Sequence, residues 1–372
     1  MEYLRLLPVK SLQPGMKLAK KIYNDDGLVL LGEEVELTAS LIRRLSSLGI
    51  DFVYISDPRT DDIIIPEPIS EETGRMAMKE IRSNFQKISN SSIKGLVYPY
   101  LGKAFLNVVE TIMDELSSRE DVLIMLANIN RADRTLFRHS LNVCIYTLML
   151  GKAFGYNQNE MMALGLGAIL HDIGKTRIAP SILLKPDGLS DKEFDEMKKH
   201  AEIGYNMLKD EPGIPLLAAH CAFQHHERID GSGYPRGLVG SDIHDYAQWI
   251  SIADSYDAMT THRVYRSAYM PHQALEVLYA GCGTLYDKKK LEVFRDHVAI
   301  YPIGMTVTLN TGEVGVVSRI PYFSPQRPVV RVLQGPEQEC LKEPYEIDLS
   351  KKLTVVVTSI EGEPASPIAE QV

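Results

Sequence analysis

The strongest constraint on the fold is a change of hydrophobic periodicity that divides the chain near residue 300. From residue 118 to about residue 298, apolar residues recur at spacings of three and four, and β-branched runs are sparse. This pattern predicts helices almost throughout that region. After Tyr301 the spacing changes to that of short strands. The predicted strands are residues 305–309, 314–319, 329–333 and 353–358, with Asn310-Thr311-Gly312 as the turn of a hairpin.

The first 60 residues predict a small α/β module. Asp25-Asp26-Gly27 is a turn signal, Thr38 is a candidate helix cap, and residues 52–55 alternate as in a short strand. The fold class we expect is multidomain, with a helical catalytic domain, a small N-terminal α/β module and a small C-terminal β module. The predicted parts are an accessory module (1–60), a linker with connecting helices (61–117), the catalytic domain (118–298), the β module (299–360) and a disordered tail (361–372).

Composition excludes several classes of protein. No run of 18 or more apolar residues exists, and Pro8 and Pro14 precede any long apolar stretch, so we expect no membrane insertion, no signal peptide and a cytoplasmic location. A net charge of −9 argues against binding to a nucleic-acid polymer. The four cysteines are scattered without a CxxC pair, which predicts buried, reduced thiols rather than a zinc site or a disulfide framework.

The candidate chemistry lies in the helical region, where histidines and aspartates stand in suggestive pairs. Imidazole and carboxylate ligands together suit iron, manganese, nickel or zinc. A carboxylate beside a histidine has two oxygens with which to bridge two cations, and paired cations can promote displacement at phosphorus. A single buried histidine is more often a core residue than a ligand, so the case depends on the whole set. That set is His139, His171, Asp172, His200, His225, His226 and Asp254.

Three neighbouring features add to this set or are set aside. Lys175 follows His171 by four residues, where its charge can meet a phosphate oxygen. The glycines after His226 are expected to let the backbone approach a bulky ligand closely. Gly174-Lys175-Thr176 imitates the end of a phosphate-binding P-loop, but Ile169 stands where that motif needs glycine, so we reject it.

Taken together, these motifs resemble the HD-GYP family, a branch of the HD metal-dependent phosphohydrolase superfamily. The HD signature corresponds to His139, His171-Asp172 and Asp254, and the branch signature is complete from His225 to Pro235. The resemblance covers about residues 125 to 298. It implies an all-α HD-type domain and a metal-dependent phosphodiesterase that hydrolyses cyclic di-GMP to pGpG, and often on to GMP.

The resemblance also implies a role for each matching residue. Asp172 would bridge two divalent metals, iron or manganese, and Lys175 would contact the scissile phosphate; these two are the candidate catalytic residues. Tyr234, Arg263 and Arg266 match positions that bind the substrate. The first metal would be held by His139, His171, Asp172 and Asp254, and the second by Asp172, His200, His225 and His226.

One departure from the family pattern bears on the number of metals. Some members carry a glutamate four residues before the first histidine, where it helps to bind a third metal, whereas this chain has Thr135. Because residues four apart share a helix face, the missing carboxylate would lie at the site itself. We therefore expect two metals rather than three.

Two other functions stay open from the sequence. One is an HD hydrolase that acts on another nucleotide, and the other is a receptor that binds a cyclic dinucleotide without cleaving it. A homodimer through the helices at 70–115 is an open arrangement too, and the sequence identifies no signalling partner and no role for the end modules.

Overall fold

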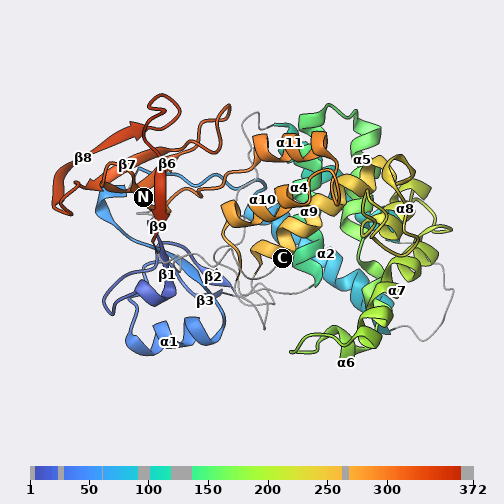
Figure 1. Ribbon diagram of the computed structural model, residues 1–372. Coiled ribbons are helices and arrows are strands. Elements are labelled where there is room, and N and C mark those ends of the chain that lie inside the picture. Colours follow the sequence, from blue (N-terminus) through green and yellow to red (C-terminus); the bar gives the residue numbers. More distant parts are fainter. Residues whose placement is uncertain are drawn as a thin grey trace. The chain divides into compact units, whose positions relative to one another are not determined.

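The computed structural model describes residues 5–23, 29–60, 62–90, 101–118, 136–261 and 268–361, which form two compact units (Figure 1). One unit gathers the described residues up to Pro66 and those from Val298 onward. The other gathers the described residues between Glu67 and His297. The predicted domain boundaries at residues 60, 117, 298 and 360 stay predictions.

The N-terminal part of the first unit is a small α/β module. β1 (Arg5–Pro8) pairs antiparallel with β4 (Phe52–Ile55), and β2 (Ile22–Tyr23) pairs antiparallel with β3 (Val29–Leu31). Helix α1 (Ala39–Ser47) begins after Thr38, whose hydroxyl accepts the N–H of Leu41, so the predicted cap is confirmed. Two short 3-10 helices complete the module, η1 (Val9–Ser11) and η2 (Pro58–Thr60).

The C-terminal part of this unit is a five-stranded antiparallel sheet. Its strand order is β8-β7-β6-β5-β9, and the predicted hairpin is confirmed as β5 and β6. The strand expected at 353–358 begins only at Val357. The strand β8 was not predicted, because it pairs with β7 alone and most of its side chains are exposed, so it carries no apolar alternation. The bounds are β5 (Thr306–Leu309), β6 (Val314–Arg319), β7 (Val329–Gln334), β8 (Cys340–Asp348) and β9 (Val357–Ile360).

Backbone and side-chain hydrogen bonds join the two ends of the chain within this unit. The N–H of Leu6 in β1 donates to the carbonyl of Gly304 at 2.7 Å, just before β5. The Arg5 guanidinium lies 2.9 Å from the Glu361 carboxylate. The disordered tail predicted at 361–372 falls, apart from Glu361, outside the described residues.

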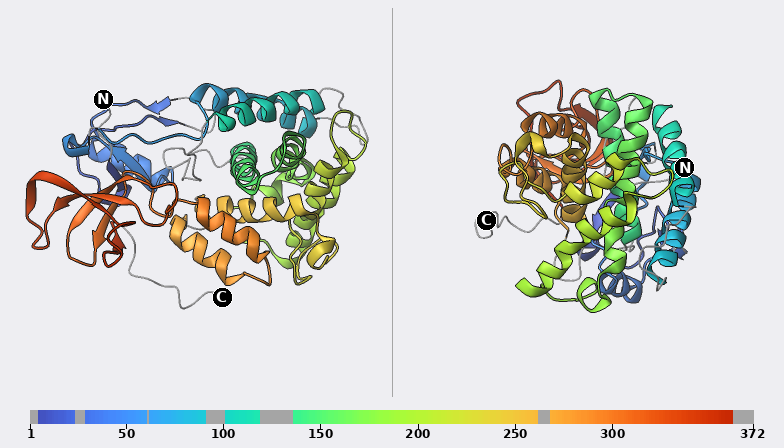
Figure 2. Two further views of the ribbon diagram at one scale, coloured as in Figure 1. Left: turned by 90° about the horizontal axis from the view of Figure 1, so that it is seen from above. Right: turned by 90° about the vertical axis from the view of Figure 1, so that its right-hand side faces the viewer.

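The second unit is helical, as predicted for the central region. Helices α2 and α3 lie side by side along one flank, and α2 also contacts α4 (Figure 2). α5 is buried on nearly every side, because its residues from Met161 to Leu170 are mostly apolar or glycine. The helices are α2 (Glu71–Asn90), α3 (Leu101–Ser117), α4 (Leu136–Phe154), α5 (Gln158–Leu170), η3 (Ile173–Arg177), α6 (Pro180–Leu183), α7 (Asp191–Leu208), α8 (Leu216–Gln224), η4 (Gly240–Asp242), α9 (Asp245–Thr260), α10 (Pro271–Ala280) and α11 (Lys288–His297).

The described residues bear on two expectations, the absence of membrane-spanning helices and the burial of the cysteines. Across the described segments, no helix is both long enough and apolar enough to cross a bilayer. Cys144 and Cys221 are buried, as expected for structural thiols. Cys282 is half-buried and Cys340 is exposed on the edge strand β8, so the prediction of burial is wrong for these two.

Candidate metal centre

Five helices and the segments that follow them bring the predicted ligands together in the helical unit. His139 lies on α4, His200 on α7 and Asp254 on α9. His171 ends α5 with Asp172 directly after it, and His225-His226 ends α8 in the same way. Ends of buried helices therefore supply four of the seven side chains, since a helix end lets adjacent residues both point inward.

Glycine at position 174 allows η3 to lie directly against α7. A Cβ at Gly174 would overlap the carbonyl oxygen of His200 and approach the backbone of Gly204. Backbone atoms cannot move aside as a flexible side chain can. The small residue therefore brings Asp172 within reach of His200, and α7 itself begins at the predicted capping box of Ser190 and Glu193.

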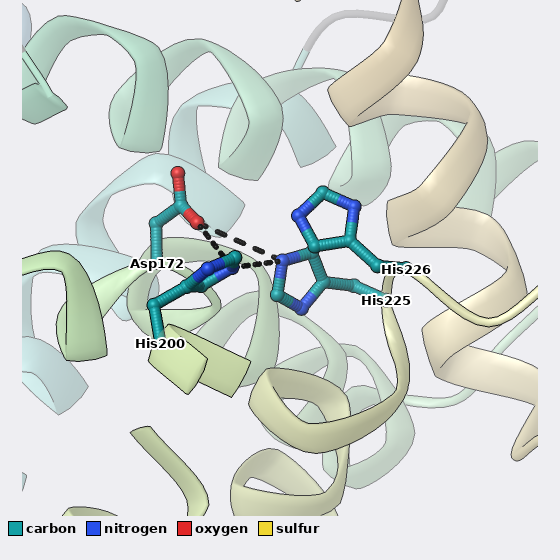
Figure 3. A group of neighbouring side chains, drawn as sticks. All are labelled: Asp172, His200, His225 and His226. Atoms are coloured by element: carbon teal, nitrogen blue, oxygen red, sulfur yellow. Dashed lines mark hydrogen bonds and ion pairs between the residues drawn. The ribbon is translucent and has the colours of Figure 1, made fainter. Parts of the chain in front are cut away.

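The seven side chains form two groups of potential metal ligands. The first group is His139, His171 and Asp254, whose ligand atoms all lie within 4.8 Å of one another. The second group, drawn in Figure 3, meets the same limit and consists of Asp172, His200, His225 and His226.

The Asp172 carboxylate lies between the two groups. Its Oδ1 is 3.4 Å from Nε2 of His200 and 3.6 Å from Nε2 of His225. Its Oδ2 is 3.4 Å from Nε2 of His171 and 3.6 Å from Nε2 of His139. One carboxylate thus presents a different oxygen to each group of imidazoles.

Hydrogen bonds on the opposite side of each ring orient the imidazoles. Nδ1 of His171 is 2.7 Å from the carbonyl of Ala168, and Nδ1 of His200 is 2.6 Å from the carbonyl of Met197. Nδ1 of His225 is likewise 3.0 Å from a carbonyl of its own helix. Because a carbonyl only accepts, each Nδ1 carries the proton, and each Nε2 is left with a lone pair that faces the centre.

Asp257 orients the remaining first-group histidine and was not assigned a role from the sequence. Its Oδ2 lies 2.7 Å from Nδ1 of His139, and its Oδ1 accepts from Nδ2 of Asn142 at 2.8 Å. Nε2 of His139 faces Oδ1 of Asp254 at 3.0 Å. A usable signal was present, because residues 254 and 257 are three apart on one helix and therefore share a face.

The charges in the centre keep the ligands in the protonation states that suit cations. Burial favours the neutral form of Asp172, yet Lys175 and His171 beside it bring its pKa well below the ordinary value. Burial lowers the pKa of His200 to about 3 and also lowers the pKa of His225 and of His226. At neutral pH the second group therefore consists of one carboxylate and three uncharged imidazoles.

The pKa of His139 is shifted in the opposite direction. Burial alone would lower its pKa, but hydrogen bonds to Asp254 and Asp257 outweigh burial and raise the pKa to about 10. A proton on Nε2 lies where a bound cation would lie, between His139 and Asp254. The pocket thus favours positive charge at that point.

The residues present fit a divalent metal site. Nε2 of His171 and Oδ1 of Asp172 are fully buried and have no hydrogen-bond partner among the described residues. Buried polar atoms normally have one, so these two atoms are free to coordinate. The donors are nitrogen and oxygen with no thiolate, a set that suits iron, manganese or zinc.

The loop after His226 folds back on the centre. Glu227 is buried, and its carboxylate accepts the backbone N–H groups of Arg236 at 2.8 Å and Leu238 at 2.9 Å. A Cβ at Gly233 would overlap the backbone of Glu227 and Arg228. Gly233 therefore packs against the start of its own loop, where no side chain fits, and the expectation that these glycines let the backbone approach a ligand stays a prediction.

The predicted substrate-binding residues fall into two classes. Tyr234 packs on the ring of His226, with centroids 4.6 Å apart, and Lys175 lies with Nζ 2.5 Å from Oδ2 of Asp172. Both are therefore at the centre. Arg263, Arg266 and Thr135 lie outside the described residues.

Two known domain families match this chain. A family model described as an HD domain matches residues 110–289, and one described as a KOW domain associated with HD domain matches residues 306–363.

Three curated relatives match part of the chain. A cyclic di-GMP phosphodiesterase of Pseudomonas aeruginosa is 33% identical over 210 residues, which is 55% of this chain and 50% of the relative. A cyclic di-GMP phosphodiesterase of Thermotoga maritima is 32% identical over 242 residues, which is 63% of this chain and 64% of the relative. A 3′3′-cGAMP-specific phosphodiesterase of Vibrio cholerae is 32% identical over 204 residues, 54% of this chain and 39% of the relative.

The chain spans about half the length of the curated relatives it matches. The matched region nevertheless contains all seven candidate ligands and the complete motif from His225 to Pro235. The chain therefore contains an HD domain, and its phosphodiesterase relatives support the resemblance to the HD-GYP family.

Proposed function

We propose that the chain is a metal-dependent phosphodiesterase that hydrolyses cyclic di-GMP to pGpG at a site for two divalent cations. The observation that carries the proposal is the position of Asp172, which has His200 and His225 near one oxygen and His139 and His171 near the other. A single buried carboxylate surrounded in this way is suited to bridge two cations. The names of the relatives support a cyclic dinucleotide as the substrate class.

In this proposal each cation has its own ligand set. The cations, iron or manganese, would supply positive charge to a phosphate in its transition state and the acidity that makes water nucleophilic near neutral pH. Thr135 in place of a carboxylate supports two cations rather than three. The first set is His139, His171, Asp172 and Asp254, and the second is Asp172, His200, His225 and His226.

The chain's own residues would then bind and orient the substrate. Lys175 carries its ammonium beside Asp172, where it can also reach a non-bridging phosphate oxygen. Tyr234 adjoins His226 and forms an aromatic wall next to the cations. We assign Arg263 and Arg266 to the substrate from their match to the family pattern, because an arginine can contact a phosphate or a guanine edge through two N–H groups.

A second candidate substrate is 3′3′-cGAMP, because a relative that is 32% identical over 204 residues is named for it. Cyclic di-GMP and 3′3′-cGAMP share one guanine and the ring of two phosphodiesters. They differ only in the second base, so the metal centre itself cannot distinguish them.

The test is hydrolysis by protein purified without oxygen and loaded with manganese or iron. Cyclic di-GMP, 3′3′-cGAMP and cyclic di-AMP are supplied separately and then in pairs, and pGpG and GMP are measured as products. The proposal expects pGpG from cyclic di-GMP at a rate that the Asp172→Asn variant loses. Tight binding of cyclic di-GMP by the metal-loaded protein without any product would refute the enzyme and indicate a receptor.

A further inference from the structure

An exposed aromatic side chain adjoins the metal centre and has no assigned role. Phe194 on α7 is 45% exposed, although it stands two turns before the buried residue His200 on the same helix. Single exposed apolar side chains are common on proteins, but ligand sites are lined mainly by apolar and aromatic side chains. The alternative role for Phe194 is to stabilise the start of α7 by packing, and comparison of Phe194→Leu with Phe194→Tyr tests it.

Aromatic rings connect Phe194 to the cation ligands. Its ring packs edge-on against Tyr234, with centroids 6.2 Å apart and planes at 82°. Tyr234 in turn lies over His226, with centroids 4.6 Å apart and planes at 31°. Phe194 is thus the outer member of a row of rings that begins at a metal ligand. A planar group attached to a phosphate at the centre would meet this row.

A cation stands next to the outer ring. The ammonium of Lys198, one turn further along α7, lies 4.8 Å from the centroid of Phe194 and 2.8 Å from Oδ1 of Asp195. An ammonium has three donors and no acceptor. Guanine presents two acceptors, O6 and N7, on one edge, whereas adenine presents one acceptor and one amino donor there.

We propose that Phe194 and Lys198 form a base-binding subsite that accepts a guanine of the cyclic dinucleotide. The base stacks on the face of Phe194 that the Lys198 ammonium covers, and the displaced ammonium donates to O6 and N7 at the edge of the base. The subsite rests on the proposed function, because the phosphate of the same nucleotide must lie at the metal centre. Stacking of a base on an aromatic ring is strong enough to set affinity, since its loss typically weakens binding about 10-fold or more.

The first experiment separates stacking from packing. Phe194→Leu keeps an apolar side chain on the helix but lacks a π face, and Phe194→Tyr keeps the face. With cyclic di-GMP as substrate, we expect Phe194→Leu to raise KM about 10-fold with little change in kcat, and Phe194→Tyr to stay near wild type. Phe154→Leu is the matched control. Phe154 is 47% exposed, but it lies at the far end of α4 and packs on Trp249.

The outcomes distinguish the subsite from the proposed function. If the wild-type protein cleaves cyclic di-GMP and Phe194→Leu has an unchanged KM, the subsite is refuted while the proposed function stands. If Phe194→Leu and Phe154→Leu raise KM equally, the effect is general and the subsite is refuted too. A metal-loaded wild-type protein that cleaves no cyclic dinucleotide refutes the proposed function and the subsite with it.

The second experiment tests the choice of base. The ratio of kcat/KM for cyclic di-GMP to that for cyclic di-AMP should exceed one in the wild-type protein and fall several-fold in Lys198→Gln. Lys192→Gln, an exposed change of equal charge on the same helix, should leave the ratio unchanged. A ratio that Lys198→Gln leaves at the wild-type value would overturn the assignment of Lys198.

Discussion

Replacing Asp257 should weaken metal binding although Asp257 is not itself a ligand. Its carboxylate holds Nδ1 of His139 at 2.7 Å and Nδ2 of Asn142 at 2.8 Å, and it is buried. In Asp257→Ala both donors lose their partner, and Asn142 is buried while the His139 side chain is only 18% exposed. Each unpaired buried donor costs about 1–3 kcal/mol, so with two donors the free energy of unfolding should fall by roughly 2–6 kcal/mol.

Replacing Asp257 should also lower the affinity for the cation that His139 binds. Loss of the partner that orients a ligating histidine typically lowers metal affinity about 10- to 100-fold. We expect this loss in Asp257→Ala and a smaller one in Asp257→Asn, which retains one oxygen to accept from His139. Asp242→Asn, an exposed change just before the same helix α9, should leave metal affinity unchanged.

The assay is titration of the metal-free protein with Mn²⁺ in competition with a chelator of known affinity, together with thermal unfolding of the same samples. The Asn variant covers the case in which the Ala variant fails to fold. A folded Asp257→Ala protein that binds Mn²⁺ as tightly as the wild type would refute the orienting role of Asp257.

Three further predictions follow from single contacts. Gly174→Ala should lower the free energy of unfolding by about 1–3 kcal/mol, because the new Cβ displaces the backbone at His200. It should also weaken binding of the cation that His200 ligates. Wild-type metal stoichiometry in titration would contradict this. Lys175→Gln should lower kcat about 100-fold and leave metal content intact, as measured by rate and by elemental analysis together. Burial opposes ionisation of Asp57, but Arg59 brings its pKa below 3.8, so its ionised form stabilises the fold above pH 3.8. The free energies of unfolding of wild type and Asp57→Asn, measured from pH 6 to pH 3, should therefore converge as the pH falls through the lowered pKa.

The helical unit and the candidate ligands follow from patterns that depend on local chemistry. Apolar spacing predicts helices wherever one face is buried, and the cap at Ser190 is determined by four residues in sequence. The strand β8 escapes prediction because an exposed edge strand needs no alternation. Cys340 is exposed because it lies on this edge strand, whereas cysteines in general are mostly buried.

The arrangement of the centre could be predicted only in part. Motifs indicate which side chains are candidates, and the structure adds which oxygen of Asp172 faces which group. Contacts between distant segments, such as Gly174 with the backbone at His200, depend on how helices pack and leave no local pattern. Phe194 illustrates the limit, because its neighbour Tyr234 is 40 positions away in the sequence.

The most direct test of the account is a count of metal ions per chain in the wild-type protein and in Asp172→Asn, with cyclic di-GMP hydrolysis measured on the same samples. Because Asp172 faces both groups of ligands, the account predicts about two ions and product for the wild type. It predicts loss of both ions and of product for the variant. An Asp172→Asn protein that retains two ions and full activity would contradict the bridging role of Asp172.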